Sequence, residues 1–206
     1  SDPSPASAPR QAANPPGAPT DLSIEPGDRR VTVDFTRGAL NGNSAGQLTW
    51  RYRVSPGGAT GTLPDGGGNI TGLTNGTSYA FTVTATNGDG TGPASSASNG
   101  ATPKGNQTLT FANPGAQNFG TSPTLSATAT SSLTPTFSSS TTGVCTVTSG
   151  GTLTFVTAGS CTIDADQAGA TAWNAATTVT QTFTVNAITP GAPTIGTATA
   201  GDTEAT

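Results

Sequence analysis

The sequence predicts an all-β chain of two tandem antiparallel β-sandwiches, followed by the truncated start of a third module. Short runs rich in Val, Thr, Ile and Phe are separated by Gly, Pro and Asn, a pattern typical of many short strands. Charged residues make up only 9% of the 206 residues and the net charge is −4. Because disordered chains of low hydrophobicity usually carry a high net charge, this composition favours folded sandwiches.

A long-period repeat indicates how the chain is divided. The sequence Pro-Gly-Ala-Pro-Thr begins at position 16 and again at position 190, an offset of 174 residues. The second copy stops at Thr206, so we expect the chain to be cut partway into a further module. The predicted divisions are a flexible Pro/Ala-rich leader (1–15), a first sandwich (16–103), a hinge (104–106), a second sandwich (107–186), and a linker with the first strand of another repeat (187–206).

Apolar residues alternate with polar ones throughout the first predicted sandwich, as they do in strands with one buried face. Turn signals such as Asn75-Gly76 separate the runs, and we expect seven short strands. Any ligand would then bind in the loops 40–47, 56–68 and 87–93, which the framework leaves free to vary. The predicted inward residues are Leu22, Ile24, Val31, Val33, Phe35, Leu48, Trp50, Tyr52, Val54, Ile70, Leu73, Tyr79, Phe81, Val83 and Ala85.

Three motifs make residues 16–103 resemble a fibronectin type III domain. They are the opening Pro-Gly-Ala-Pro, the segment Leu73-Thr-Asn-Gly-Thr-Ser-Tyr79, and the alternation that continues from Tyr79 through Ala85. The resemblance implies an immunoglobulin-like sandwich in which Leu73 and Tyr79 form a tyrosine corner, with the phenol bonded to upstream backbone. Phe35 stands where that family often has Trp. The resemblance implies little about function, since this scaffold serves many roles.

The second predicted sandwich holds both cysteines of the chain, Cys145 and Cys161, each in phase with inward residues of its strand. Two thiols cannot form a closed zinc site without His, and the chain has none. A disulfide between neighbouring strands of an exported protein is the simpler interpretation, and a pair of buried free thiols is the alternative.

Residues 107–186 look like the bacterial immunoglobulin-like repeats of large secreted proteins. The matching pieces are Gln107–Phe111, Val144–Val147, Ala158–Ile163 and the segment from Gln167 through Trp173 to Ala176. In such repeats, Cys pairs of this kind look like bridges within one domain. The two resemblances together imply a large surface or adhesin protein of a bacterium.

No residue combination predicts catalysis, a cofactor or a metal ion. General acid–base chemistry usually relies on His or on paired carboxylates in perturbed environments, and Asp164 and Asp166 are predicted to face solvent from one strand. The segment Asn87–Gly90 resembles a calcium loop but lacks spaced acids, and a turn between strands is favoured. Arg51 and Arg53 alternate with Trp50 and Tyr52, which predicts outward charges on a strand.

Three functions are compatible with this sequence. The first is a non-catalytic extracellular spacer, stalk or adhesive segment of a bacterial surface protein. The others are accessory linker modules of a secreted polysaccharide-degrading enzyme, and a self-assembling fibre subunit. Partners would be a surface, a glycan, a protein or neighbouring modules, and the isolated chain is predicted to be monomeric, with fibre assembly as the alternative. Nucleic acid is excluded for lack of clustered Lys and Arg, and membrane insertion for lack of a long apolar run.

Overall fold

A computed structural model describes residues 14–189, 191–193 and 196. The predicted leader, apart from its last two residues, and most of the predicted third-module strand lie outside these residues. The described strands are β1 Thr20–Gly27, β2 Arg30–Thr36, β3 Thr49–Ser55, β4 Thr60–Leu63, β5 Gly67–Thr71, β6 Ala80–Asn87, β7 Gly90–Thr91, β8 Leu109–Phe111, β9 Gln117–Asn118, β10 Ala127–Ala129, β11 Thr136–Ser139, β12 Cys145–Val147, β13 Leu153–Phe155, β14 Gly159–Asp166 and β15 Val179–Asn186, with one 3-10 turn, η1 Ala45–Gln47. The all-β prediction is confirmed.

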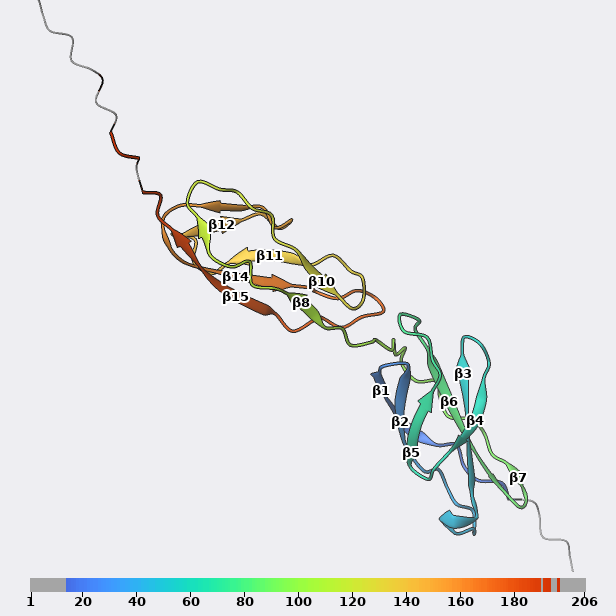
Figure 1. Cartoon of the computed structure of the whole chain (residues 1–206). Coiled ribbons are helices and arrows are strands. Elements are labelled where there is room, and N and C mark those ends of the chain that lie inside the picture. Colours follow the sequence, from blue (N-terminus) through green and yellow to red (C-terminus); the bar gives the residue numbers. More distant parts are fainter. Residues whose placement is uncertain (1–13, 190, 194–195, 197–206) are drawn as a thin grey trace, which may run out of the picture. The chain divides into compact units, whose positions relative to one another are not determined.

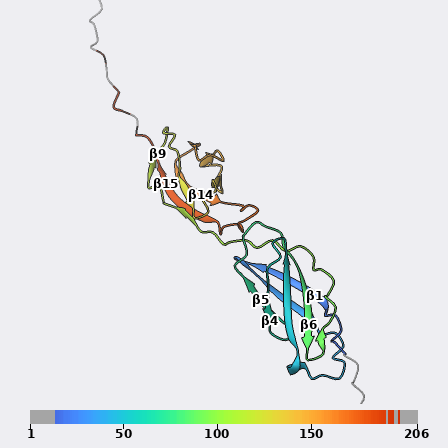
Figure 2. The same cartoon turned by 90° about the vertical axis from the view of Figure 1, so that its right-hand side faces the viewer.

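Strands β1–β7 form the first sandwich from two antiparallel sheets, ordered β1-β2-β5 and β4-β3-β6-β7 (Figure 1). Figure 2 shows the two layers from another side. The pairing of β2 with β5 depends on a glycine, because Gly67 has φ +138° and a Cβ there would lie 2.1 Å from the carbonyl oxygen of Val33.

The core of the first sandwich lies between its sheets. Trp50 and Phe35, from opposite layers, have ring centroids 4.8 Å apart, a distance at which aromatic rings pack favourably. The aromatic side chain on the third strand therefore fills the centre beside Phe35. The buried cluster is Val31, Val33, Phe35, Trp50, Val54, Leu63, Ile70, Leu73, Phe81, Val83, Ala85 and Ala101, with Leu22, Ile24, Leu48, Tyr52 and Tyr79 partly buried against it.

Two segments predicted as free loops contain strands. Strand β4 and the start of β5 fall within 56–68, and β7 falls within 87–93. Strand β4 reads Thr-Gly-Thr-Leu and buries only Leu63, so its alternation is too short to signal a strand. It is instead recruited by β3, whose backbone pairs with it from Trp50 to Arg53.

Strands β8–β15 form the second sandwich, in which β14 and β15 are eight residues long and the others are two to four residues long. The largest sheet is ordered β11-β14-β15-β9, and two separate two-stranded sheets, β10-β8 and β12-β13, complete the sandwich. In the largest sheet, β9 pairs with β15 in parallel over two residues, whereas the other pairings are antiparallel. The buried apolar residues of the second sandwich are Leu109, Phe111, Leu125, Phe137, Cys145, Leu153, Phe155, Cys161, Ile163, Ala165, Phe183 and Val185.

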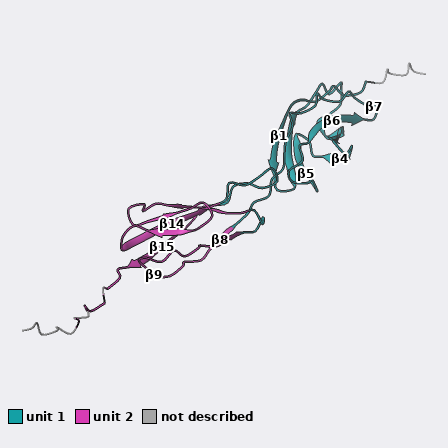
Figure 3. Cartoon of the chain, turned by 90° about the horizontal axis from the view of Figure 1, so that it is seen from above, with its two compact units in different colours: residues 1–108, 129–133, 167–177 teal, residues 109–128, 134–166, 178–206 magenta. Residues whose placement is uncertain are grey.

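The described residues divide into two compact units (Figure 3). One takes in residues up to 108 together with 129–133 and 167–177, and the other takes in 109–128, 134–166 and the residues from 178 onward. Within the first unit, the amide of Gly105 donates to the carbonyl of Ala172 over 2.9 Å, and that of Asn174 donates to the carbonyl of Gly105 over 2.8 Å. The hinge at 104–106 and the domain boundaries stay predictions. None of the described residues belongs to a helix long and apolar enough to cross a membrane.

Candidate functional site

The two aspartates of β14 are surrounded by hydroxyl groups. Thr180 donates a hydrogen bond to Oδ1 of Asp164 over 2.5 Å, and Ser140 donates to Oδ2 of the same side chain. Thr178 donates to Asp166. The hydrogen bond from Ser140, followed by that from Thr180, holds the pKa of Asp164 below its usual value. A carboxyl group that acts as a general acid at neutral pH needs a raised pKa. The lowered pKa of Asp164 therefore makes it unsuited to that role.

The segment Asn87–Gly90 is a closed turn between β6 and β7. Oδ1 of Asn87 accepts the backbone amides of Asp89 and Gly90 at 2.9 and 3.0 Å, and Nδ2 donates to the carbonyl of Asn14 over 3.1 Å. An asparagine whose oxygen caps two amides is the usual device for such a turn. Among the described residues, no group of three or more His, Cys, Asp or Glu side chains is placed to hold a metal ion.

Tyr79 and Leu73 lie together where β6 begins. The backbone amide of Thr74, five residues upstream, donates to the phenol oxygen of Tyr79 over 3.2 Å. Leu73 is buried, and its amide donates to the carbonyl of Arg29 over 3.0 Å. Tyr79 also exchanges two backbone hydrogen bonds with Ala101, each of 2.8 Å. The phenol therefore ties the loop before β6 to the sheet, and hydrogen bonding from Thr74 lowers the pKa of Tyr79.

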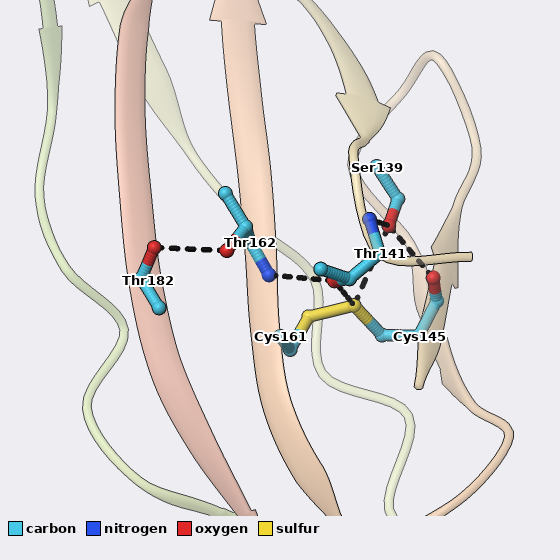
Figure 4. Close-up of a disulfide and its surroundings, with 6 residues drawn as sticks. All are labelled: Ser139, Thr141, Cys145, Cys161, Thr162 and Thr182. Atoms are coloured by element: carbon cyan, nitrogen blue, oxygen red, sulfur yellow. Dashed lines mark hydrogen bonds between the residues drawn. A yellow bond between two sulfur atoms is a disulfide. The ribbon is translucent and has the colours of Figure 1, made fainter. Parts of the chain in front are cut away.

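A disulfide joins Cys145 and Cys161, whose Cα atoms are 5.7 Å apart (Figure 4). Both cysteines are fully buried. Hydroxyl groups surround the bridge: Ser139 donates to the carbonyl of Cys145 over 2.7 Å, and Oγ1 of Thr141 accepts the amide of Thr162 at 2.8 Å. The predicted disulfide is confirmed, and the alternative of buried free thiols is wrong.

The bridge connects two different sheets. Cys145 belongs to β12, which pairs with β13, whereas Cys161 belongs to β14, which pairs with β11 and β15. The sequence predicted neighbouring strands because in-phase alternation identifies the inward face but not which sheet lies opposite. As placed, the disulfide fastens the small sheet across the core to the large one.

The outward side of the β4-β3-β6-β7 sheet carries the exposed Arg51 and Arg53, as their alternation with Trp50 and Tyr52 predicts. Each arginine lies between hydroxyl residues of the neighbouring strands: Arg51 pairs in register with Thr62 and Thr84, and Arg53 with Thr60 and Thr82. A surface hollow of about 420 Å³ lies along this side. We call these six residues the arginine face. Sequence analysis missed its threonines, because register across strands is not visible in one strand's alternation.

Comparison with known proteins gives a family match within the first sandwich. The family model of the fibronectin type III domain matches residues 17–101. No curated protein matches the chain significantly. Among solved structures, the third fibronectin III domain of human KIAA0343 protein is 22% identical and shares 50% of this chain and 94% of that one, with a TM-score of 0.39. The FN1-FN3 domains of chicken CNTN1 are 15% identical and share 84% of this chain and 68% of that one, with a TM-score of 0.37.

Proposed function

Because residues 17–101 form a fibronectin type III domain, which is typically a non-catalytic module of multidomain proteins, we propose that the chain is a spacer or adhesive segment of a larger extracellular protein. The resemblance of residues 107–186 to bacterial immunoglobulin-like repeats supports a bacterial surface protein. A buried disulfide supports an extracellular location, since such bonds persist mainly in oxidising compartments.

One observation carries this proposal: groups that could do chemistry are engaged in holding strands together. The phenol of Tyr79 accepts a backbone amide, the two thiols are joined across the core, and the side chain of Asn87 closes a turn. A spacer needs cohesion of this kind, because its task is to keep distance and resist unfolding. Modules arranged in tandem contribute such resistance nearly independently of one another.

Single-molecule stretching of the chain between two handle proteins tests the proposal. A spacer should show a separate, reversible unfolding event for each sandwich. While the disulfide is intact, the residues between the two cysteines should add nothing to the length gained when the second sandwich unfolds. After the disulfide is reduced, the length gained in that event should increase by roughly 50 Å, at about 3.5 Å per residue. Extension without discrete unfolding events would contradict the role of a spacer that resists force.

A hydrolysis assay on a panel of soluble polysaccharides tests whether the same chain is catalytic. The proposal predicts no turnover. Turnover that a single Asp164→Asn or Asp166→Asn substitution abolishes would overturn it. Asp89→Asn is the matched control, since it also removes one carboxylate but lies in the β6–β7 turn.

A further inference from the structure

We propose that copies of this chain associate face to face, with the arginine face of one copy lying on a complementary aspartate face of another. The aspartate face is the outward side of β14 with its neighbours: Asp164, Asp166, Thr136, Ser138 and Thr180. This interaction goes beyond the proposed spacer function and is measured independently of it. It differs from the monomer that the sequence predicts and is nearer to the alternative of self-assembly.

The arginine face is a sheet surface with positive charge alone. Strands β3, β4, β6 and β7 contain two charged residues, Arg51 and Arg53, and no acid. The opposite sheet carries Asp21, Glu25 and Asp34 against a single arginine. Within the described part of the chain, neither guanidinium of the arginine face has an ion pair or hydrogen bond, whereas Arg37 is paired with Asp65. The arginine face is therefore an uncompensated positive patch on an acidic protein.

The aspartate face is its counterpart in the second sandwich. Residues 109–189 contain no Lys or Arg, and Asp164 and Asp166 are their only charged residues. Both aspartates stand on the outward side of β14, an interior strand of its sheet. Hydrogen bonds from Ser140 and Thr180 keep the Asp164 carboxylate ionised, and each of its oxygens retains a free lone pair for a further donor.

The two faces match in spacing as well as in charge. Each pair of like charges stands at positions i and i+2 of an interior strand, so each spans about 6.5–7 Å along the sheet. In register beside Arg51, Arg53 and Asp164 stand only short hydroxyl side chains, on both neighbouring strands. The long side chains of Arg51 and Arg53 therefore extend beyond their neighbours, and a guanidinium can reach a carboxylate that lies level with the hydroxyl groups around it and meet it through two parallel hydrogen bonds.

A second copy suits the arginine face better than an acidic polysaccharide does. Sugar rings are commonly recognised by exposed aromatic faces, and the aromatic residues of β3 point inward, with Trp50 buried and Tyr52 half-buried. The contact should be weak, because two strand faces of this size bury roughly 600–800 Å² in total, below the range of stable complexes. It should also weaken as salt shortens the Debye length from about 8 Å at 0.15 M to about 3 Å at 1 M.

Charge reversal with complementation tests the proposal by sedimentation velocity over a range of protein and salt concentrations. The unmodified chain should self-associate at low salt and dissociate as salt rises. R51E/R53E should lose at least about tenfold in association constant, because like charges then face each other. D164R/D166R should also lose association, although it moves the net charge from −4 to zero and so removes general repulsion. Mixing the two variants should restore association between unlike chains.

The control is R29E/R30E, which changes the net charge by the same amount at the turn between β1 and β2 and should associate like the unmodified chain. Circular dichroism melts establish that each variant is folded. The proposal is overturned if the unmodified chain stays monomeric at low salt, if D164R/D166R associates as before, or if the mixture of variants fails to associate. Loss in R51E/R53E alone would also overturn it, because the arginine face would then contact an acidic surface of the second copy other than the aspartate face.

Discussion

The two sandwiches reach the same architecture by different means. The first has strands of up to eight residues and a core centred on Trp50, Phe35 and Phe81, and no cysteine belongs to it. The second also has two strands of eight residues, β14 and β15, but four of its strands are only three residues long, and its small β12-β13 sheet is fastened to the large sheet by the disulfide. The difference teaches that a covalent bridge can fasten a sheet of short strands to a sheet that has a long backbone ladder of its own, between β14 and β15.

The largest expected effect is on the packed core of the first sandwich. Phe81 is 1% exposed and is the second residue of β6. Phe81→Ala should lower the free energy of unfolding of the first sandwich by about 3–5 kcal/mol, because it removes a buried ring and leaves a cavity. Native-state hydrogen exchange at the amides of Val83 and Ile163 reports on the two sandwiches separately. Equal loss of protection at both would contradict independent cores.

The disulfide should have the next largest effect, confined to the second sandwich. Cys145→Ser should lower its free energy of unfolding by about 3 kcal/mol, since the bridge closes a loop with a sequence separation of 16. Calorimetry should show one melting transition moving down while the other stays in place. If a thiol-reactive dye labels both cysteines of the unreduced native protein, the bridge does not exist.

Removing the hydroxyl group of Tyr79 should have a smaller effect on the free energy of unfolding of the first sandwich. Tyr79→Phe removes the acceptor of the Thr74 amide and should cost the first sandwich about 1 kcal/mol in urea unfolding. Tyr52→Phe is the matched control, because the Tyr52 phenol has no hydrogen-bond partner among the described residues. A cost as large in the control would show that the hydroxyl of Tyr79 acts through something other than this bond.

The smallest expected effect is on the loss of stability at low pH. The pKa of Asp65 is lowered by the hydrogen bond from Arg37, and that of Asp164 by hydrogen bonds from Ser140 and Thr180. A carboxylate with a lowered folded-state pKa contributes stability that is complete above its unfolded pKa, about 3.9, and is lost as pH falls through the folded value.

The two aspartates should therefore affect different sandwiches below about pH 4. Asp65→Asn should flatten the acid dependence of amide protection in the first sandwich, and Asp164→Asn should do so in the second. Hydrogen exchange between pH 2 and 6 measures both. An unchanged acid dependence in each variant would show that these hydrogen bonds do not persist in solution.

Much of the fold could be predicted from inward alternation. Every second residue from Val31 to Phe35 and from Phe81 to Ala85 lies in the core as predicted, because one-sided burial imposes a period of two on each strand. The bridge between Cys145 and Cys161 could be predicted from the two cysteines and the absence of His. Such features depend on one strand or one residue type at a time.

What could not be predicted depends on how strands meet. Strand β4 forms because β3 offers it a backbone edge, and its own four residues carry little signal. The sheet that holds Cys145 is set by pairing with β13, which alternation does not encode. The threonines beside Arg51 and Arg53 are likewise placed by register, so the arginine face becomes visible only in three dimensions.

The central claim is that packing alone holds the first sandwich, whereas packing and a bridge between sheets together hold the second. Hydrogen exchange of the unmodified chain, with and without a reductant, tests it most directly. We predict that reduction lowers protection in β12–β14 by the equivalent of about 3 kcal/mol and leaves β2, β3 and β6 unchanged. Protection that is unaltered in β12–β14, or that falls in both sandwiches together, would contradict the claim.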